Sequence, residues 1–168
     1  MAATYEPIAT QTLGSNTATV TFSSIPGTYT DLVLICTVRS TYAGTQNDIT
    51  LRFNSDTGTN YSSTWVSGSG SAASSGRNSN QDYGYFFYLP AANATAGVWG
   101  VGIANIMNYS NTTTNKTVLT RNNDPLAGVG AYAGLWRSTS AITSISIQSP
   151  LVNLVSGSTF TLYGIKAA

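Results

Sequence analysis

Apolar and polar residues alternate with a period of two in several short segments of this sequence. In residues 49–54 the apolar side chains fall on one face of an expected strand and the polar ones on the other, with Ile49, Leu51 and Phe53 on the apolar face. Residues 17–22 and 160–165 show a similar alternation. This period is typical of strands that bury one face.

Other segments carry apolar residues on both faces. Residues 31–39 form the most apolar run of the chain, and residues 83–89 (YGYFFYL) are dense in aromatics. Such strands are either central in a sheet or covered by a partner subunit. On the second alternative, we expect Tyr83, Tyr85 and Phe87 to be subunit-contact residues.

Ten strand-like segments can be counted, and turn signals separate nearly all of them. They are residues 17–22, 31–39, 49–54, 61–66, 83–89, 98–109, 116–121, 129–136, 142–148 and 160–165. No amphipathic helix longer than two turns is apparent. Short strands at this spacing predict an all-β fold: a single-domain antiparallel β-sandwich, jelly-roll-like, with about eight to ten strands.

Three further segments complete the expected organisation of this one domain, residues 1–168. Residues 1–16 are expected to form an irregular N-terminal arm. Residues 67–81 are rich in Ser and Gly and are expected to form a long surface loop, which a neighbouring subunit could order. Residues 54–58 (NSDTG) predict a tight turn, since Asn and Asp bond their own backbone.

Composition supports the all-β prediction and narrows the partners. Only 8% of the 168 residues are charged, against about 25% in a typical soluble protein, and Ser, Thr, Asn and Gly supply the polarity. The net charge is +1 and the seven Lys and Arg residues are scattered, so nucleic acid is not an expected partner. A surface this poor in charge is either covered in an assembly or simply coated with hydroxyl groups.

The ends and the cysteine content bear on location. Cys36 is the single cysteine and lies in an apolar run, where a small core residue is expected. The first residues lack the basic and apolar regions of a signal peptide, and no apolar run is long enough for a membrane helix. We therefore expect synthesis in the cytoplasm and no membrane partner.

Catalytic chemistry is not indicated. The chain has no histidine, and its six carboxylates stand apart from one another, so no catalytic, cofactor or metal site is predicted, and no enzyme. Residues 54–58 lack the closing acid of a calcium loop. Exposed aromatics on a sandwich can form a sugar-binding platform, but Trp65, Trp99 and Trp136 are more often core fillers in such folds.

Five strings in chain order carry a resemblance that spans nearly the whole sequence: TVTFSSIPGTYTDLVLI, LRFNSDTGTNYS, SGRNSNQ, AGLWRSTSAITSISI and STFTLYGIKAA. Together they resemble small virion structural proteins of tailed bacteriophages, frequent in aquatic and cyanobacterial phages. The resemblance implies a β-sandwich that is part of the virion. Its motifs are structural and carry no active site.

Two roles are compatible with this resemblance. The first is a capsid decoration or cement protein, typically a homotrimer, that binds the major capsid protein and stabilises the outer shell. The alternative is a tail, fibre or baseplate component that binds a host-surface glycan. The absence of a coiled-coil, collagen-like or β-helical shaft favours the first role as our expectation.

Overall fold

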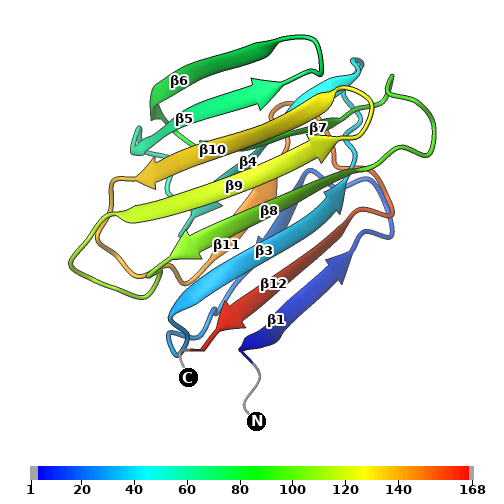
Figure 1. The fold of residues 1–168 in the computed structure, drawn as a ribbon. Helices are drawn as coiled ribbons and strands as arrows, with labels where there is room; N and C mark the ends of the chain where they lie inside the picture. Colours follow the sequence, from blue (N-terminus) through cyan, green and yellow to red (C-terminus); the bar gives the residue numbers. More distant parts are fainter. Residues whose placement is uncertain (1–3, 167–168) are drawn as a thin grey trace.

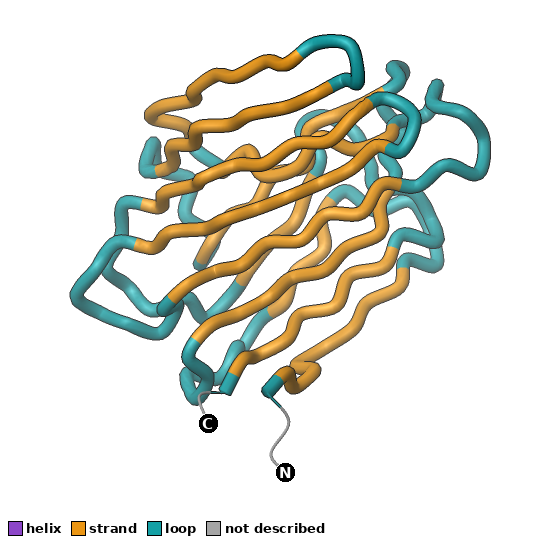
Figure 2. The backbone as a smooth tube through the Cα atoms, viewed as in Figure 1, coloured by secondary structure: helices purple, strands orange, loops and turns teal. Residues whose placement is uncertain are grey.

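The computed structural model describes residues 4–166, which form twelve strands and no helix (Figures 1 and 2). The strands are β1 (Tyr5–Thr12), β2 (Thr19–Phe22), β3 (Asp31–Val38), β4 (Gln46–Phe53), β5 (Tyr61–Gly68), β6 (Ala73–Gln81), β7 (Gly84–Pro90), β8 (Gly100–Met107), β9 (Lys116–Asp124), β10 (Gly128–Trp136), β11 (Ile145–Gln148) and β12 (Thr159–Ile165). Among these residues, accordingly, no helix could cross a membrane.

The strands form two antiparallel sheets packed as a sandwich. The large sheet has the order β1-β12-β3-β8-β9-β10-β5-β6, and the small sheet has the order β2-β11-β4-β7. The all-β sandwich prediction is confirmed, although the sandwich has two strands more than the upper end of the expected range.

The connectivity is that of a jelly roll. The pairs β5–β6, β4–β7, β3–β8, β2–β11 and β1–β12 are nested in sequence and fall alternately in the large and small sheets. A two-stranded ribbon folded over itself produces this nesting. The β9–β10 hairpin is an insertion that widens the large sheet between β8 and β5.

The core follows the expected period of two. Ile49, Leu51 and Phe53 are fully buried between the sheets. Cys36 is also buried, and its burial raises the pKa of the thiol to about 12, so it behaves as the small core residue that the sequence predicts.

The predicted N-terminal arm and Ser/Gly loop are both wrong. Tyr5–Thr12 is strand β1, whereas residues 1–3 lie outside the described part of the chain. Ala73–Gln81 is strand β6, joined to β5 by a short turn. These are the two edge strands of the large sheet (Figure 1). Neither β1 nor β6 contains a fully buried residue, so neither carries the hydrophobic period that marks the other strands.

Candidate functional site

Strands β5 and β10 pair in register and carry two aromatic pairs on the inner face of the large sheet. Trp136 lies opposite Tyr61, and Tyr132 lies opposite Trp65. Four residues separate the pairs along each strand, so all four side chains share one face. We call this pairing the β5–β10 ladder. The Tyr61–Trp136 pair, which is covered by the small sheet, is its closed end, and the Trp65–Tyr132 pair, which borders a groove, is its open end.

The closed end is dry and fully packed. Tyr61 and Trp136 stack with ring centroids 6.3 Å apart, and Phe53 lies 5.6 Å from Trp136. Tyr61 and Phe53 are fully buried, and Trp136 is nearly so. Burial of this size makes the cluster a major part of the core. Trp136 is therefore the core filler that its sequence context predicts.

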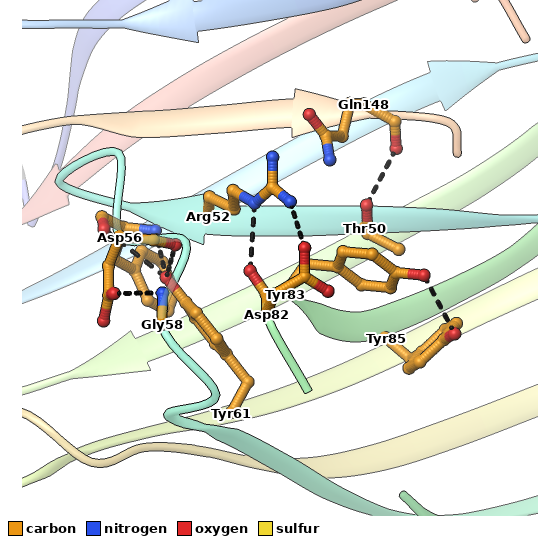
Figure 3. Close-up of polar contacts among 10 residues, drawn as sticks. Thr50, Arg52, Asp56, Gly58, Tyr61, Asp82, Tyr83, Tyr85 and Gln148 are labelled. Carbon is orange, nitrogen blue, oxygen red and sulfur yellow. Dashed lines mark hydrogen bonds and ion pairs between the residues drawn. The ribbon is translucent and has the colours of Figure 1, made fainter. Parts of the chain in front are cut away.

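The polar groups of Trp136, Tyr61 and Asp56 at the closed end all have partners, whereas the buried hydroxyl of Ser63, between the two ends of β5, has none among the described residues. The Trp136 Nε1–H donates to Asp56 Oδ2 at 2.6 Å, and the Phe53 N–H donates to the Tyr61 hydroxyl at 2.9 Å. Asp56 Oδ1 accepts the Gly58 N–H at 2.8 Å, which confirms the predicted turn (Figure 3). Burial raises the pKa of the Asp56 carboxyl, but hydrogen bonds from Trp136, Asn60 and Gly58 outweigh that effect and leave the pKa below its usual value.

The open end is a groove of about 540 Å³. Its floor and walls come from β5, β6, β9 and β10 of the large sheet and from β4 and β7 of the small sheet. The lining contains four aromatic side chains, three amides and one carboxylate, which are Trp65, Tyr85, Tyr88, Tyr132, Gln46, Asn78, Asn122 and Asp48. Its size lies within the usual range of ligand sites.

Two glycines shape this groove. A Cβ on Gly76 of β6 would lie 2.7 Å from the Trp65 ring, so the glycine lets the indole lie close against the neighbouring strand. Gly128 at the start of β10 has a φ of +149°, and a Cβ there would lie 2.4 Å from the Gly68 carbonyl oxygen. Neither position accepts a larger residue without movement of the groove wall.

Tyr85 is held in place from the small sheet. Its hydroxyl lies 3.1 Å from that of Tyr83, and the two rings meet edge to face with centroids 5.0 Å apart. The Arg52 guanidinium lies 5.6 Å from the centre of the Tyr83 ring and pairs with Asp82 (Figure 3). The hydrogen bond with Tyr83, followed by burial, raises the pKa of Tyr85. This chain of contacts fixes one aromatic wall of the groove.

Asp48 differs from Asp56 in having no partner. Its side chain is half-buried and makes no hydrogen bond or ion pair with the residues that the structure describes. Burial raises the pKa of its carboxyl. Asp48 lines the groove together with Tyr88 and Tyr132. After burial, its charge is the next cause that raises the pKa of both tyrosines.

Asn122 supplies a second unpartnered oxygen. It is 8% exposed, and its Nδ2–H donates to the Tyr88 carbonyl at 2.7 Å. Its Oδ1 has no partner among the described residues. Buried acceptors without partners are rare in folded proteins, so their presence often marks a site for a ligand or an ordered water.

The predicted contact residues are divided between two environments. Phe87 is fully buried in the core, so its side chain is not available to a partner in this structure. Tyr83 and Tyr85 are half-exposed on or beside β7. Their contact with another subunit stays a prediction. Trp65 belongs to the groove, and Trp99 is half-exposed beside Gly157, away from it.

Sequence reasoning did not single out Asp48 or Asn122 as site residues. Asp48 directly precedes the expected strand at residues 49–54, and Asn122 directly follows the one at residues 116–121, so neither was expected inside a strand. The structure places both inside strands. A polar residue at an inward-facing position of a strand could have pointed to the site. Recognising such a position requires the pairing register of the strand, which the sequence does not show.

The groove can stack and hydrogen-bond a ligand. No group of three or more Cys, Asp or Glu residues that could hold a metal ion occurs in the described part of the chain. The aromatic faces offer apolar contact, while Asp48, the amides and the tyrosine hydroxyls offer donors and acceptors.

No protein-family model matches the sequence, and no curated protein matches it. Among solved structures, the Caenorhabditis elegans galectin LEC-6 is similar at 12% identity and a TM-score of 0.34, over 92% of this chain and 94% of that one. The alginate lyase Aly36B is similar at 8% identity and a TM-score of 0.37, over 95% of this chain and 81% of that one. At these values neither structure informs the function of this chain.

Proposed function

We propose that this protein is a non-catalytic binding protein whose groove holds a glycan chain. The observation that carries the proposal is the open aromatic pair of Trp65 and Tyr132, beside the unpartnered carboxylate of Asp48. Sugar rings have apolar C–H faces that pack on aromatic rings and hydroxyl groups that donate to carboxylate oxygens. A glycan therefore matches both halves of the lining.

The phage resemblance supplies a biological setting for this activity. Within it, the protein is a tail, fibre or baseplate component that contacts a host-surface glycan. Binding without turnover is sufficient for that role, and the isolated carboxylate in the groove is consistent with it because glycoside hydrolysis ordinarily requires a pair.

The test is a printed glycan array probed with the wild-type chain and with Trp65→Ala. Truncation of a central tryptophan costs about 2 kcal/mol or more, so the affinity for the bound glycans is expected to fall roughly thirtyfold. Trp99→Ala is the matched control, because Trp99 is half-exposed outside the groove. Unchanged binding by Trp65→Ala, or no binding by the wild-type chain, contradicts the proposal.

A second candidate function rests on the outer face of the large sheet. Val66, Leu119, Val129 and Met107 project from this face and are each at least 42% exposed. Exposed apolar groups gathered on one face favour a protein partner. This observation supports the capsid decoration or cement role, with the major capsid protein or further copies of the chain, as a trimer, covering the face.

Light scattering and co-sedimentation with purified capsids test this second candidate. A trimer that binds shells stoichiometrically, and loses that binding in Leu119→Ser, is the expected result. A monomer that does not co-sediment with capsids argues against it. Because Asp48 lines the groove and not the outer face, Asp48→Asn should leave capsid binding intact.

A further inference from the structure

The groove contains one charged group and no compensating cation. Asp48 is its single charged side chain, and neither Lys nor Arg is part of the lining. Arg77 and Arg121 project from the opposite face of the large sheet, since they pair with Thr64 and Ala131 at outward positions. The other five cations hydrogen-bond elsewhere in the chain, namely Arg39, Arg52, Lys116, Arg137 and Lys166.

We propose that Asp48 makes the groove selective for uncharged glycans and excludes those that carry uronic acid or sulfate groups. This inference rests on the proposed function, because it concerns the ligand class of the same groove. Asp48 acts as an acceptor for sugar hydroxyls. It is a specificity-determining residue and has no catalytic role.

The physical basis is the partly buried position of the carboxylate. A hydrogen bond from a hydroxyl to a charged acceptor is about twice as strong as one between neutral groups. A neutral sugar therefore gives Asp48 the partner that the protein does not. An anionic sugar brings a second negative charge into a half-buried site, where repulsion is weakly screened and no cation offsets it.

The amides fit the same ligand class. Asn122, Asn78 and Gln46 line the groove, although the Oδ1 of Asn122 is itself shielded from solvent. Amide and carboxylate oxygens are acceptors that pair with hydroxyl donors, so of the groove's amide and carboxylate groups only the amide N–H groups could donate to a uronate oxygen. A metal ion is a poorer occupant for Asp48, because calcium takes six to eight oxygen ligands and usually several carboxylates.

Matched polysaccharides provide the direct test. Laminarin, konjac glucomannan and galactan would each be titrated as the native polymer and after oxidation of the C6 hydroxyl to a carboxylate, which adds charge to an unchanged backbone. For whichever polymer the wild-type chain binds, the oxidised form is expected to bind at least tenfold more weakly, and more so at low salt. Titrations with and without EDTA should agree.

Two variants at Asp48 sharpen the test. Asp48→Asn keeps the shape of the side chain, and we expect about tenfold weaker binding of the neutral polymer together with a smaller penalty for the oxidised one. Asp48→Lys should reverse the preference. Glu6→Gln is the matched control, since it removes the same charge from β1 at the far edge of the large sheet. Glu6→Gln should change neither the affinity for the native polymer nor that for the oxidised one.

The outcomes separate this inference from the proposed function. If wild-type chain binds the oxidised polymer as tightly as the native one, selectivity by Asp48 is refuted while glycan binding stands. The same holds if Asp48→Asn affects both forms equally. If no glycan on the array and none of these polymers binds, the proposed function itself fails.

Discussion

The two ends of the β5–β10 ladder use the same residue types for opposite purposes. Each end has a tryptophan, a tyrosine opposite it and an aspartate nearby. At the closed end, the ring of Trp136 is covered and its N–H bonds Asp56. At the open end, Trp65 is half-exposed and Asp48 has no partner among the described residues. Hydrogen-bonded polar groups are typical of a core, and a carboxylate that has no partner beside an open groove is available to a ligand.

The largest expected difference between the two ends concerns stability. Trp136→Ala should lower the free energy of unfolding by about 3–5 kcal/mol, because it leaves a large cavity between the sheets. Trp65→Ala should lower it by about 1 kcal/mol or less, since the groove is already open to water. Urea unfolding of both variants measures the contrast. Equal losses would mean that the open end is part of the core.

Two glycines that contact aromatic rings, Gly134 beside the closed end and Gly76 at the open end, allow a comparison with smaller expected effects. A Cβ on Gly134 would lie 2.2 Å from the Phe86 ring, so Gly134→Ala should cost about 1–3 kcal/mol by overpacking a dry cluster. Gly76→Ala displaces only the half-exposed Trp65 ring, so its thermal midpoint should change little while its glycan affinity falls. A large loss of stability in Gly76→Ala would contradict an adaptable groove.

Substitution of Asp48 or Asp56 should change stability least, and the two substitutions should change it in opposite directions. The pKa of Asp48 is raised above its usual value of 3.8, so its folded-state contribution to stability is lost as pH rises through the folded pKa. The pKa of Asp56 is lowered, so its contribution is present above 3.8 and is lost as pH falls through the folded pKa. At pH 7, Asp48→Asn should therefore raise the thermal midpoint, whereas Asp56→Asn should lower it.

Thermal unfolding at pH 7 and at about pH 3 measures both differences. The difference in thermal midpoint between Asp48→Asn and the wild-type chain should disappear at the acidic pH, because both proteins then carry a neutral group at this position. A lower midpoint for Asp48→Asn at pH 7 would show that the carboxylate stabilises the fold, which would remove the reason to assign it to a ligand.

Most of the fold could be predicted from the sequence because most strands bury one face. The ten expected segments all overlap observed strands, from β2 to β12. The two missed strands, β1 and β6, are the edges of the large sheet and contain no fully buried residue, so their sequences carry no clear hydrophobic period. The single glycine of β6, Gly76, lets the Trp65 ring lie against this strand.

The groove could not be predicted in the same way. Tyr61 and Trp65 belong to one expected strand and alternate onto the same face. Which of them is covered depends on how β5 packs against the small sheet, including β7. Asn122 follows the same logic, since it lies on β9 in a segment whose composition indicates a loop. Sequence identifies which residues alternate, and the packing of the small sheet decides which of them stay open.

The chain's three tryptophans permit one direct test of the central claim, that the open end of the ladder is the ligand site. Each tryptophan contributes one indole N–H signal in a ¹H–¹⁵N spectrum, and the spectrum would be followed during titration with the glycan that binds best on the array. The account predicts that the Trp65 signal shifts with ligand while those of Trp136 and Trp99 stay in place. A shift of Trp136 or Trp99 with an unmoved Trp65 would contradict it.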